Sequence, residues 1–345
     1  RPLQTDERRL MSAGRGTLVE AWYRGAWWLW LLRPVELLFR IITALRRFLY
    51  RCGWLRRHRA PRPVVVVGNI TVGGTGKTPV VIALLERLAR RKVHVVSRGY
   101  GGREEGPLQV DPHRHTAADV GDEPLLLAAF APTWIAKSRA AGVRAAVDAG
   151  AEVVIMDDGF QNPSVEKTLS VVVVDAETGF GNGRVLPAGP LREPVPVGLA
   201  RADLVVTVGP TEAQATFSDK WDMEVSPPRA RARLEPLQTG MDWDGLRVLA
   251  FAGIGRPAKF FATLRALGAD LVRAEALDDH QPLGDALMKR LETESAALSA
   301  QLVTTEKDAV RLPQSFRQKV LTLPVRLRFE DAAALDEALG RIGLD

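Results

Sequence analysis

Cysteine is almost absent from this chain of 345 residues, and long apolar runs are missing from its N-terminal part. Cys52 is the only cysteine, which excludes an internal disulfide, cannot support a metal site alone and favours a reducing compartment. In the first 60 residues, the longest uncharged run covers residues 25–32, far short of the roughly 20 residues that a membrane-spanning helix requires. Repeats and low-complexity tracts are also lacking. The remaining composition, 46% apolar and 26% charged, is that of a folded protein long enough for two domains.

Acidic residues are scarce only at the N-terminal end. Residues 1–60 contain 13 arginines and four acidic residues, a net charge of +9, whereas the rest of the chain has 34 basic and 37 acidic residues. Since the basic excess lies wholly in the first segment, we expect no nucleic-acid partner for the body of the protein.

The basic N-terminal segment is also rich in tryptophan. Tryptophan beside arginine is typical of a membrane interface, and helical spacing from Pro34 onward places apolar residues on one side with arginines opposite. We therefore expect residues 17–59 to lie on an anionic membrane surface; the alternative is a helix that packs this apolar face on the protein's own body. The tryptophans are Trp22, Trp27, Trp28, Trp30 and Trp54, the apolar face is Leu38, Ile41, Ile42, Leu45, Phe48 and Leu49, and the opposite arginines are Arg40, Arg47 and Arg51.

This segment does not have the pattern of a cleaved signal peptide. Its apolar run is short, and Arg33-Pro34 follows where small residues and a cleavage site are required. We expect the segment to be retained and to face the cytosol. Residues 1–10 are interpreted as an extension before Met11, with no function assigned.

A glycine-rich turn follows four consecutive valines at residues 64–67. Glycine allows backbone N–H groups to approach an anion closely, and the turn ends in Gly76-Lys77-Thr78 before apolar residues at helical spacing. The pattern indicates a phosphate-binding loop of the G-G-x-G-K-T form, since Thr71 stands where the strict motif has glycine. Lys77 is expected to reach the β- and γ-phosphates of a nucleotide and Thr78 to bind Mg²⁺. The candidate nucleotide-binding residues are Gly73, Gly74, Thr75, Gly76, Lys77 and Thr78; a turn that binds nothing is the alternative.

Two pairs of carboxylates are candidate metal or catalytic groups. Asp157 and Asp158 end an apolar strand, the usual place for a second nucleotide-site element that serves Mg²⁺, although Asp-Asp-Gly is also a common turn. Asp122 and Glu123 open a predicted helix, where complementing the helix dipole is the simpler role.

Three basic side chains have weaker signals. His280 follows two aspartates on a predicted loop, but a lone histidine is more often structural. Arg139 and Arg192 could equally be solvated surface charges, although Arg192 lies in a proline-rich loop of the kind that carries binding groups.

From residue 61 onward, short β-rich runs alternate with helical spacing. Such alternation predicts a parallel sheet with helices on both faces and a ligand at the carboxyl ends of the strands. We expect an α/β protein with an N-terminal extension and amphipathic helix, a P-loop NTPase-like core domain, an interdomain linker that includes a basic alternation, and a smaller α/β domain. The expected ranges are 1–60, 61–225, 226–246 and 247–345 respectively.

Eight motifs along the chain resemble those of the tetraacyldisaccharide 4'-kinase family, and the resemblance covers nearly the whole chain from Met11 onward. The resemblance implies transfer of the ATP γ-phosphate to the 4'-hydroxyl of tetraacyldisaccharide 1-phosphate, which forms lipid IVA in lipid A biosynthesis. It also implies two α/β domains with a cleft between them, ATP and Mg²⁺ as cofactors, and peripheral attachment to the cytoplasmic face of the bacterial inner membrane, with no obligate protein partner. The motifs are G-N-I-T-V-G-G-T-G-K-T-P at 68–79, S-R-G-Y-G-G at 97–102, G-D-E-P at 121–124, D-D-G-F-Q at 157–161, G-N-G-R-V-L-P-A-G-P-L-R-E-P at 181–194, F-A-G-I-G at 251–255, D-H at 279–280 and T-T-E-K-D at 304–308.

The resemblance also implies roles for single residues. Asp122 acting with His280 corresponds to the family's proposed base, and Asp157, Asp158, Thr78 and Glu123 correspond to groups near the metal. Arg139 and Arg192 correspond to basic residues near the transferred phosphate, while Lys77 belongs to the phosphate loop. One departure is Asn162, which stands where the family has a histidine and cannot titrate.

Two other classes of protein stay open. Membrane-associated switch ATPases of the partitioning or cell-division type also use G-G-x-G-K-T and an amphipathic helix, but they resemble a pattern with lysine where this chain has Val72, and they lack the second α/β domain. A scaffold that retains ATP binding without turnover is the third possibility.

Overall fold

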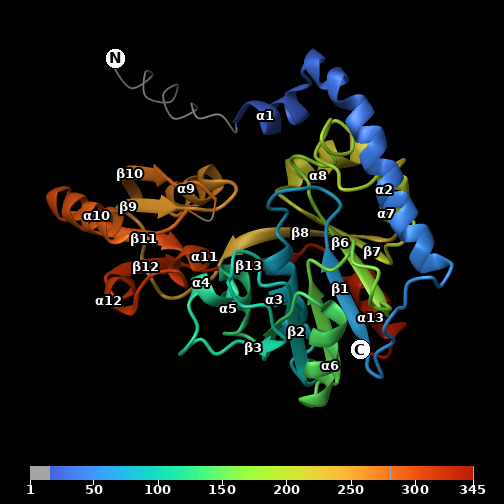
Figure 1. Ribbon diagram of the computed structural model, residues 1–345. Coiled ribbons are helices and arrows are strands. Elements are labelled where there is room, and N and C mark those ends of the chain that lie inside the picture. Colours follow the sequence, from blue (N-terminus) through green and yellow to red (C-terminus); the bar gives the residue numbers. More distant parts are fainter. Residues whose placement is uncertain (1–15, 280, 345) are drawn as a thin grey trace.

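The computed structural model describes residues 16–279 and 281–344 (Figure 1). Its strands are β1 Val64–Gly68, β2 Val93–Ser97, β3 Leu108–Gln109, β4 Thr133–Ile135, β5 Val153–Asp157, β6 Leu169–Asp175, β7 Leu204–Val208, β8 Arg229–Pro236, β9 Arg247–Ala252, β10 Asp270–Ala276, β11 Gln301–Thr305, β12 Val320–Leu323 and β13 Val325–Phe329. Its helices are α1 Gly16–Arg24, α2 Arg33–Arg51, α3 Lys77–Arg87, α4 Ala117–Val120, α5 Asp122–Leu127, α6 Arg139–Asp148, α7 Val195–Leu199, α8 Thr211–Trp221, α9 Pro257–Ala266, α10 Asp285–Ala297, α11 Glu306–Ala309, α12 Gln314–Arg317 and α13 Ala333–Gly340, with a 3-10 helix at Trp27–Leu32.

A nine-stranded sheet forms the larger part of the molecule. Its order is β13-β8-β7-β6-β1-β5-β2-β4-β3, and only the two edge pairs, β13 with β8 and β3 with β4, are antiparallel. All five residues of the central strand β1 are buried, as expected for a strand that helices cover on both faces. One face packs on α3, α5 and α13 and the other on α6, α7 and α8 (Figure 1). The expected α/β class with a parallel-dominated sheet is confirmed.

A second sheet of four parallel strands, in the order β10-β9-β11-β12, forms a smaller unit beside the first (Figure 1). Phe260, Phe261 and Leu264 of α9 pack on one of its faces, and Met288 and Leu291 of α10 pack on the other. The smaller sheet therefore has its own two-sided core.

The sheets do not divide the chain where the sequence analysis placed the boundaries. The expected linker at 226–246 contains β8, which is a strand of the large sheet. The expected C-terminal domain contains β13 and α13, which belong to the large sheet and its core. Ala230 and Ala232 are buried while Arg231 and Arg233 are exposed, so the basic alternation is the period-two pattern of a half-buried strand. The chain thus crosses between the two sheets twice, before β9 and after β12.

Helix α2 docks on the large sheet through the side opposite its apolar face. Glu36 is buried and accepts a hydrogen bond from the Val185 backbone N–H (3.2 Å), Phe39 packs on the core, and Arg47 lies 3.7 Å from Glu193. The apolar stripe is bare: Leu38, Ile41, Ile42, Leu45 and Phe48 are each more than half exposed. Within residues 16–279 and 281–344, no helix is both long enough and apolar enough to cross a bilayer.

Candidate active site

The phosphate loop connects the carboxyl end of β1 to the first turn of α3. Gly73 and Gly76 have φ angles of 105° and 87°, a backbone region that L side chains rarely adopt. A Cβ built on Gly73 or Gly74 would meet no described atom within 4 Å, so the backbone of the loop faces open space. Inside the turn, Asn69 Nδ2 donates to Thr75 Oγ1 (3.2 Å) and braces the loop. The loop therefore has glycine backbone geometry and faces open space at the N-terminus of α3, and anion binding there stays a prediction.

Asp157 and Asp158 lie at the carboxyl end of β5, the strand paired with β1. Asp157 is fully buried, and this burial together with the charge of Glu123 raises its pKa well above the ordinary value. Its Oδ2 accepts from Ser97 Oγ (3.3 Å), whereas its buried Oδ1 has no hydrogen-bond partner in the part of the chain that the structure describes. Asp158 has a positive φ of 49°, which turns its side chain toward the phosphate loop. The two neighbouring carboxylates thus meet different surroundings.

Asp158 is held by two cations from other motifs. Lys77 Nζ lies 3.6 Å from Asp158 Oδ1, and Arg192 Nη1 lies 3.1 Å from the same oxygen. Burial opposes ionisation, but these two cations lower the pKa of Asp158 below its usual value. Arg192 also donates to Gln161 Oε1 (3.3 Å). Three of the predicted residues are therefore brought together at one end of the sheet.

Arg139 is buried at the end of β5 and is not the solvated surface charge that was the alternative. It is 3% exposed, and its Nη2 donates to the backbone carbonyls of Asp157 (3.0 Å) and Asp158 (3.4 Å). Burial lowers the pKa of its guanidinium. Its Nη1 is buried and finds no acceptor among the described residues. Arg139 thus supports the backbone that carries both carboxylates, and phosphate contact stays a prediction.

Asp122 and Glu123 begin α5, and tight packing fixes the turn before them. Gly121 has φ 90°, and a Cβ there would come within 2.6 Å of the Tyr100 carbonyl oxygen, so the G-D-E-P and S-R-G-Y-G-G motifs touch through backbone. Asp122 is buried, and its Oδ1 accepts from the Glu123 N–H (2.9 Å). Because the charge of Glu123 helps to raise the pKa of Asp157, this turn lies close enough to the carboxylates of β5 to interact with them electrostatically.

The smaller sheet contributes to the same site. His280 lies outside the described residues, but its neighbour Asp279 is within 3.7 Å of Lys307 Nζ, which also lies near Asp122 and Glu123. A Cβ on Gly255 of the F-A-G-I-G turn would lie 3.8 Å from the Gly74 backbone nitrogen, so this turn adjoins the phosphate loop. No role for Lys307 was predicted from the sequence, where only its place in the T-T-E-K-D motif distinguishes it from other lysines.

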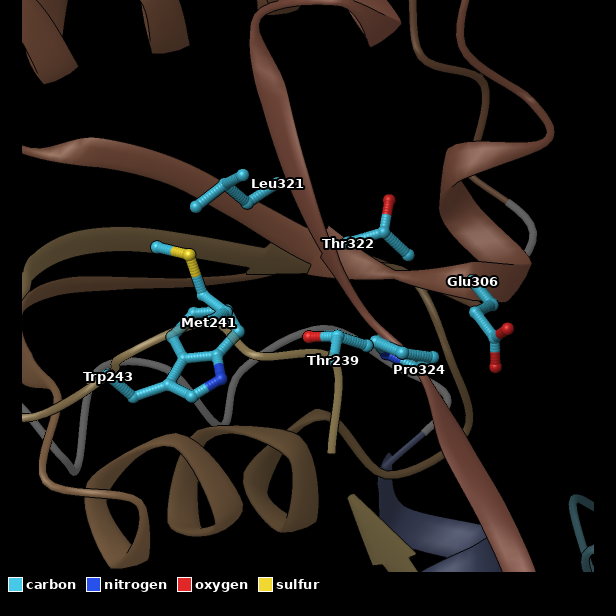
Figure 2. Close-up of a pocket in the computed structure, with 7 residues that line it drawn as sticks. All are labelled: Thr239, Met241, Trp243, Glu306, Leu321, Thr322 and Pro324. Carbon is cyan, nitrogen blue, oxygen red and sulfur yellow. The ribbon is translucent and has the colours of Figure 1, made fainter. Parts of the chain in front are cut away.

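A pocket of about 390 Å³ lies at the junction of the two sheets (Figure 2). None of the predicted site residues lines it. Glu306, the neighbour of Lys307, stands at one end and Trp243 with Met241 at the other (Figure 2). The lining residues are Thr239, Met241, Trp243, Glu306, Leu321, Thr322 and Pro324.

Comparison with known proteins agrees with this arrangement. A family model described as tetraacyldisaccharide-1-P 4'-kinase matches residues 28–342. A tetraacyldisaccharide 4'-kinase of Dinoroseobacter shibae is 63% identical over 82% of this chain and 85% of its own, and one of Rhodospirillum centenum is 54% identical over 90% of each. A crystal structure of "apo" form LpxK from Aquifex aeolicus in complex with ATP superposes with a TM-score of 0.75 at 27% identity, covering 91% of this chain and 99% of that one.

These matches decide between the classes that the sequence left open. They extend through the smaller sheet, for which a switch ATPase of the partitioning or cell-division type has no counterpart, so that alternative is not favoured. The phosphate loop, the two carboxylates after β5 and the second α/β unit all fall inside the matched region, and the chain belongs to the tetraacyldisaccharide-1-P 4'-kinase family.

Proposed function

We propose that the protein transfers the γ-phosphate of ATP to the 4'-hydroxyl of tetraacyldisaccharide 1-phosphate and so forms lipid IVA. The observation that carries this proposal is the convergence of Lys77, Asp158 and Arg192 at one end of the sheet, beside the Asp122 turn. Cations that surround a phosphate loop stabilise the charge on the phosphoryl oxygens during transfer.

The residues present fit a magnesium ion. Asp157 Oδ1 is buried and unsatisfied within the described chain, and Thr78 opens α3 on the adjacent loop. Among the described residues, no three His, Cys, Asp or Glu side chains form a metal cage, which suits an ion that binds through one or two carboxylates plus phosphates. Thr78, Asp157, Asp158 and Glu123 are the candidates to hold it. When bound, Mg²⁺ would neutralise phosphate charge.

In this reaction the 4'-oxygen forms a bond to the γ-phosphorus while the bond to the β–γ bridging oxygen breaks, and ADP leaves. Lys77 and Arg192 hold the phosphoryl oxygens, and Asp122 orients the acceptor hydroxyl and takes its proton, with His280 as its proposed partner. An ordinary aspartate is a weak base toward an alcohol, so proton transfer to Asp122 comes late. Arg139 keeps the strand end in place beneath the transferred group.

The lipid acceptor accounts for the unusual surface of α2. A groove of about 340 Å³ lies between α2 and α7, and one of its lining residues, Pro194, is two residues along the chain from Arg192. The lining residues are Leu37, Arg40, Ile41, Ala44, Arg47, Pro194 and Val197. Apolar side chains next to arginines are suited to acyl chains and an anionic lipid surface. We therefore place the enzyme peripherally on the cytoplasmic face of the inner membrane.

The decisive experiment offers the purified protein γ-labelled ATP with tetraacyldisaccharide 1-phosphate in mixed micelles. We expect label in the lipid fraction, dependence on Mg²⁺, and release of phosphate to water at a much lower rate. Label that appears only as inorganic phosphate, with or without lipid, would contradict the kinase assignment and favour an ATPase.

A further inference from the structure

Lys307 joins three carboxylates that come from both parts of the molecule. Its Nζ lies 3.5 Å from Glu123 Oε1 and 3.8 Å from Asp122 Oδ2 on the large sheet, and 3.7 Å from Asp279 Oδ1 on the smaller one. The lysine side chain is 22% exposed. Lys307 is therefore a partly buried cation placed between carboxylates of the two sheets.

The residues beside Lys307 hold it in this position. Asp308 is fully buried and accepts hydrogen bonds from Thr305 Oγ1 (2.7 Å), the Gly253 N–H (3.0 Å) and Arg311 (3.0 Å). On its other side, Glu306 accepts from Arg326 Nη1 (2.9 Å) of β13. Because both neighbours are anchored, α11 is fixed and the side chain between them extends across to α5.

The Asp308 bond also connects this helix to the phosphate loop. Gly253 begins the turn whose Gly255 adjoins Gly74. A shift of α11 would therefore move the Lys307 side chain and the turn next to the phosphates together. Asp308 therefore links the helix that carries Lys307 to the turn that adjoins the phosphate loop.

We propose that Lys307 is a positioning residue for phosphoryl transfer: it neutralises Asp122, Glu123 and Asp279 together, so that the acceptor side of the site, carried on both sheets, assembles in one geometry. This inference rests on the proposed function, because it assigns Asp122 to the acceptor hydroxyl. Like charges a few ångströms apart repel strongly in a partly buried site, and without a cation the Asp279 loop would move away from α5. Displacement of a catalytic group by about 1 Å costs on the order of 100-fold in rate.

The competing explanation is that Lys307 only holds the two sheets together, and a second lysine of the chain can serve as a control. Lys259 on α9 of the smaller sheet also bridges to two carboxylates of the large one, Asp175 (3.3 Å) and Glu177 (3.0 Å), which Arg256 contacts as well, and it lies outside the acceptor side of the site. If Lys307 only holds the two sheets together, neutralising Lys307 or Lys259 should have a similar effect on turnover.

The test measures kcat and KM of the full-length enzyme for Lys307→Met, Lys307→Arg and Lys259→Met. We expect Lys307→Met to lower kcat by about 100-fold with the KM for ATP within about threefold, and Lys307→Arg to recover at least about tenfold of that loss. Lys259→Met should stay within about threefold of the parent. The proposal is overturned if Lys307→Met keeps parental kcat, if arginine fails to rescue, or if Lys259→Met loses as much.

A melting-temperature cycle tests the same contact without substrate. In the parent, Asp122→Asn removes an attraction to Lys307 and should lower Tm, whereas in the Lys307→Met background it relieves repulsion and should raise Tm or leave it unchanged. We expect the two shifts to differ by about 2 °C or more; equal shifts would overturn the proposal. If the parent fails to phosphorylate the lipid, the proposed function is lost, while this cycle still decides whether Lys307 neutralises the cluster.

Discussion

Two helices of this protein, α2 and α3, have amphipathic sequences, but the apolar side is buried in one and exposed in the other. In α3, Val80, Val81, Leu84 and Leu85 are buried against the large sheet. In α2, the stripe from Leu38 to Phe48 faces away from the protein, and the docked side carries the buried Glu36 together with the partly buried Phe39. Each pattern predicts that one side of a helix is apolar, but it does not say what covers that side. The difference indicates that α3 stabilises the fold, whereas the exposed face of α2 contributes little to it; a lipid partner for that face stays a prediction.

The largest expected effect comes from the first residue of α3. Lys77→Ala should reduce kcat/KM by about a thousandfold or more, because a partly buried cation beside the phosphate loop is lost, while the unfolding free energy changes little. Labelled-lipid assays and chemical denaturation measure both quantities. Arg90→Ala, at an exposed position just past α3, is the control. Parental kinase activity in Lys77→Ala would remove this helix from the catalytic account.

A matched pair of truncations compares the two helices directly. Leu84→Ala on α3 removes a side chain with 0% exposure and should lower the unfolding free energy by about 2–5 kcal/mol. Leu38→Ala on α2, where the side chain is 57% exposed, should change it by no more than about 0.5 kcal/mol. Urea unfolding of both variants in the absence of lipid measures the difference. Equal losses would mean that something on the protein covers the stripe of α2.

A third variant tests how α2 is attached. Glu36→Ala leaves the buried Val185 N–H without its acceptor and should cost about 1–3 kcal/mol of unfolding free energy. Glu36→Gln keeps an oxygen at the same place and should cost less. Unfolding curves that do not distinguish the parent from either variant would show that the docked face contributes nothing.

The smallest effect on stability, and the most specific effect on function, is expected from the stripe itself. Ile41→Glu with Leu45→Glu should leave Tm within about 2 °C of the parent but abolish sedimentation with anionic vesicles and raise the apparent KM for the lipid more than it lowers kcat. Arg90→Glu lowers the net charge by the same two units at a site far from the stripe, so it controls for charge alone. Should the double variant pellet with vesicles as well as the parent does, the membrane role of α2 would be wrong.

Much of the fold follows from patterns within short stretches. The strands β2 and β7 fall on valine-rich stretches at 93–97 and 204–208, because a strand that helices cover on both faces consists mainly of apolar, β-branched residues. The strand β8 was missed, since alternating arginine and alanine next to two prolines is equally typical of a connector. Its pairing with β7 and β13 decides the matter, and that pairing involves residues far away in the sequence.

The residues of the site also divide into those that a local sequence pattern predicted and those that it did not. Lys77 was predicted from the glycine-rich turn, and Asp157 and Asp158 from their place at the end of an apolar strand, because such positions have a direct chemical meaning. The structure brings Lys77 within 3.6 Å of Asp158, and their roles stay predictions. The position of Arg139 beneath the β5 carbonyls was not predictable, because nothing near it in the sequence says which acceptor its guanidinium reaches. Lys307 carries a charge like many surface lysines, and only the meeting of α11 with α5 distinguishes it.

By itself, the sequence determined the α/β class, the phosphate loop and the apolar stripe of α2, because each depends on spacing along one strand, turn or helix. Only the tertiary structure decided that β8 and β13 belong to the large sheet, that α2 docks by its polar side, and that Lys307 reaches Asp122. These outcomes depend on which distant segments pack together. Burial and charge pairing between such segments are properties of the folded chain as a whole, and no local pattern encodes them.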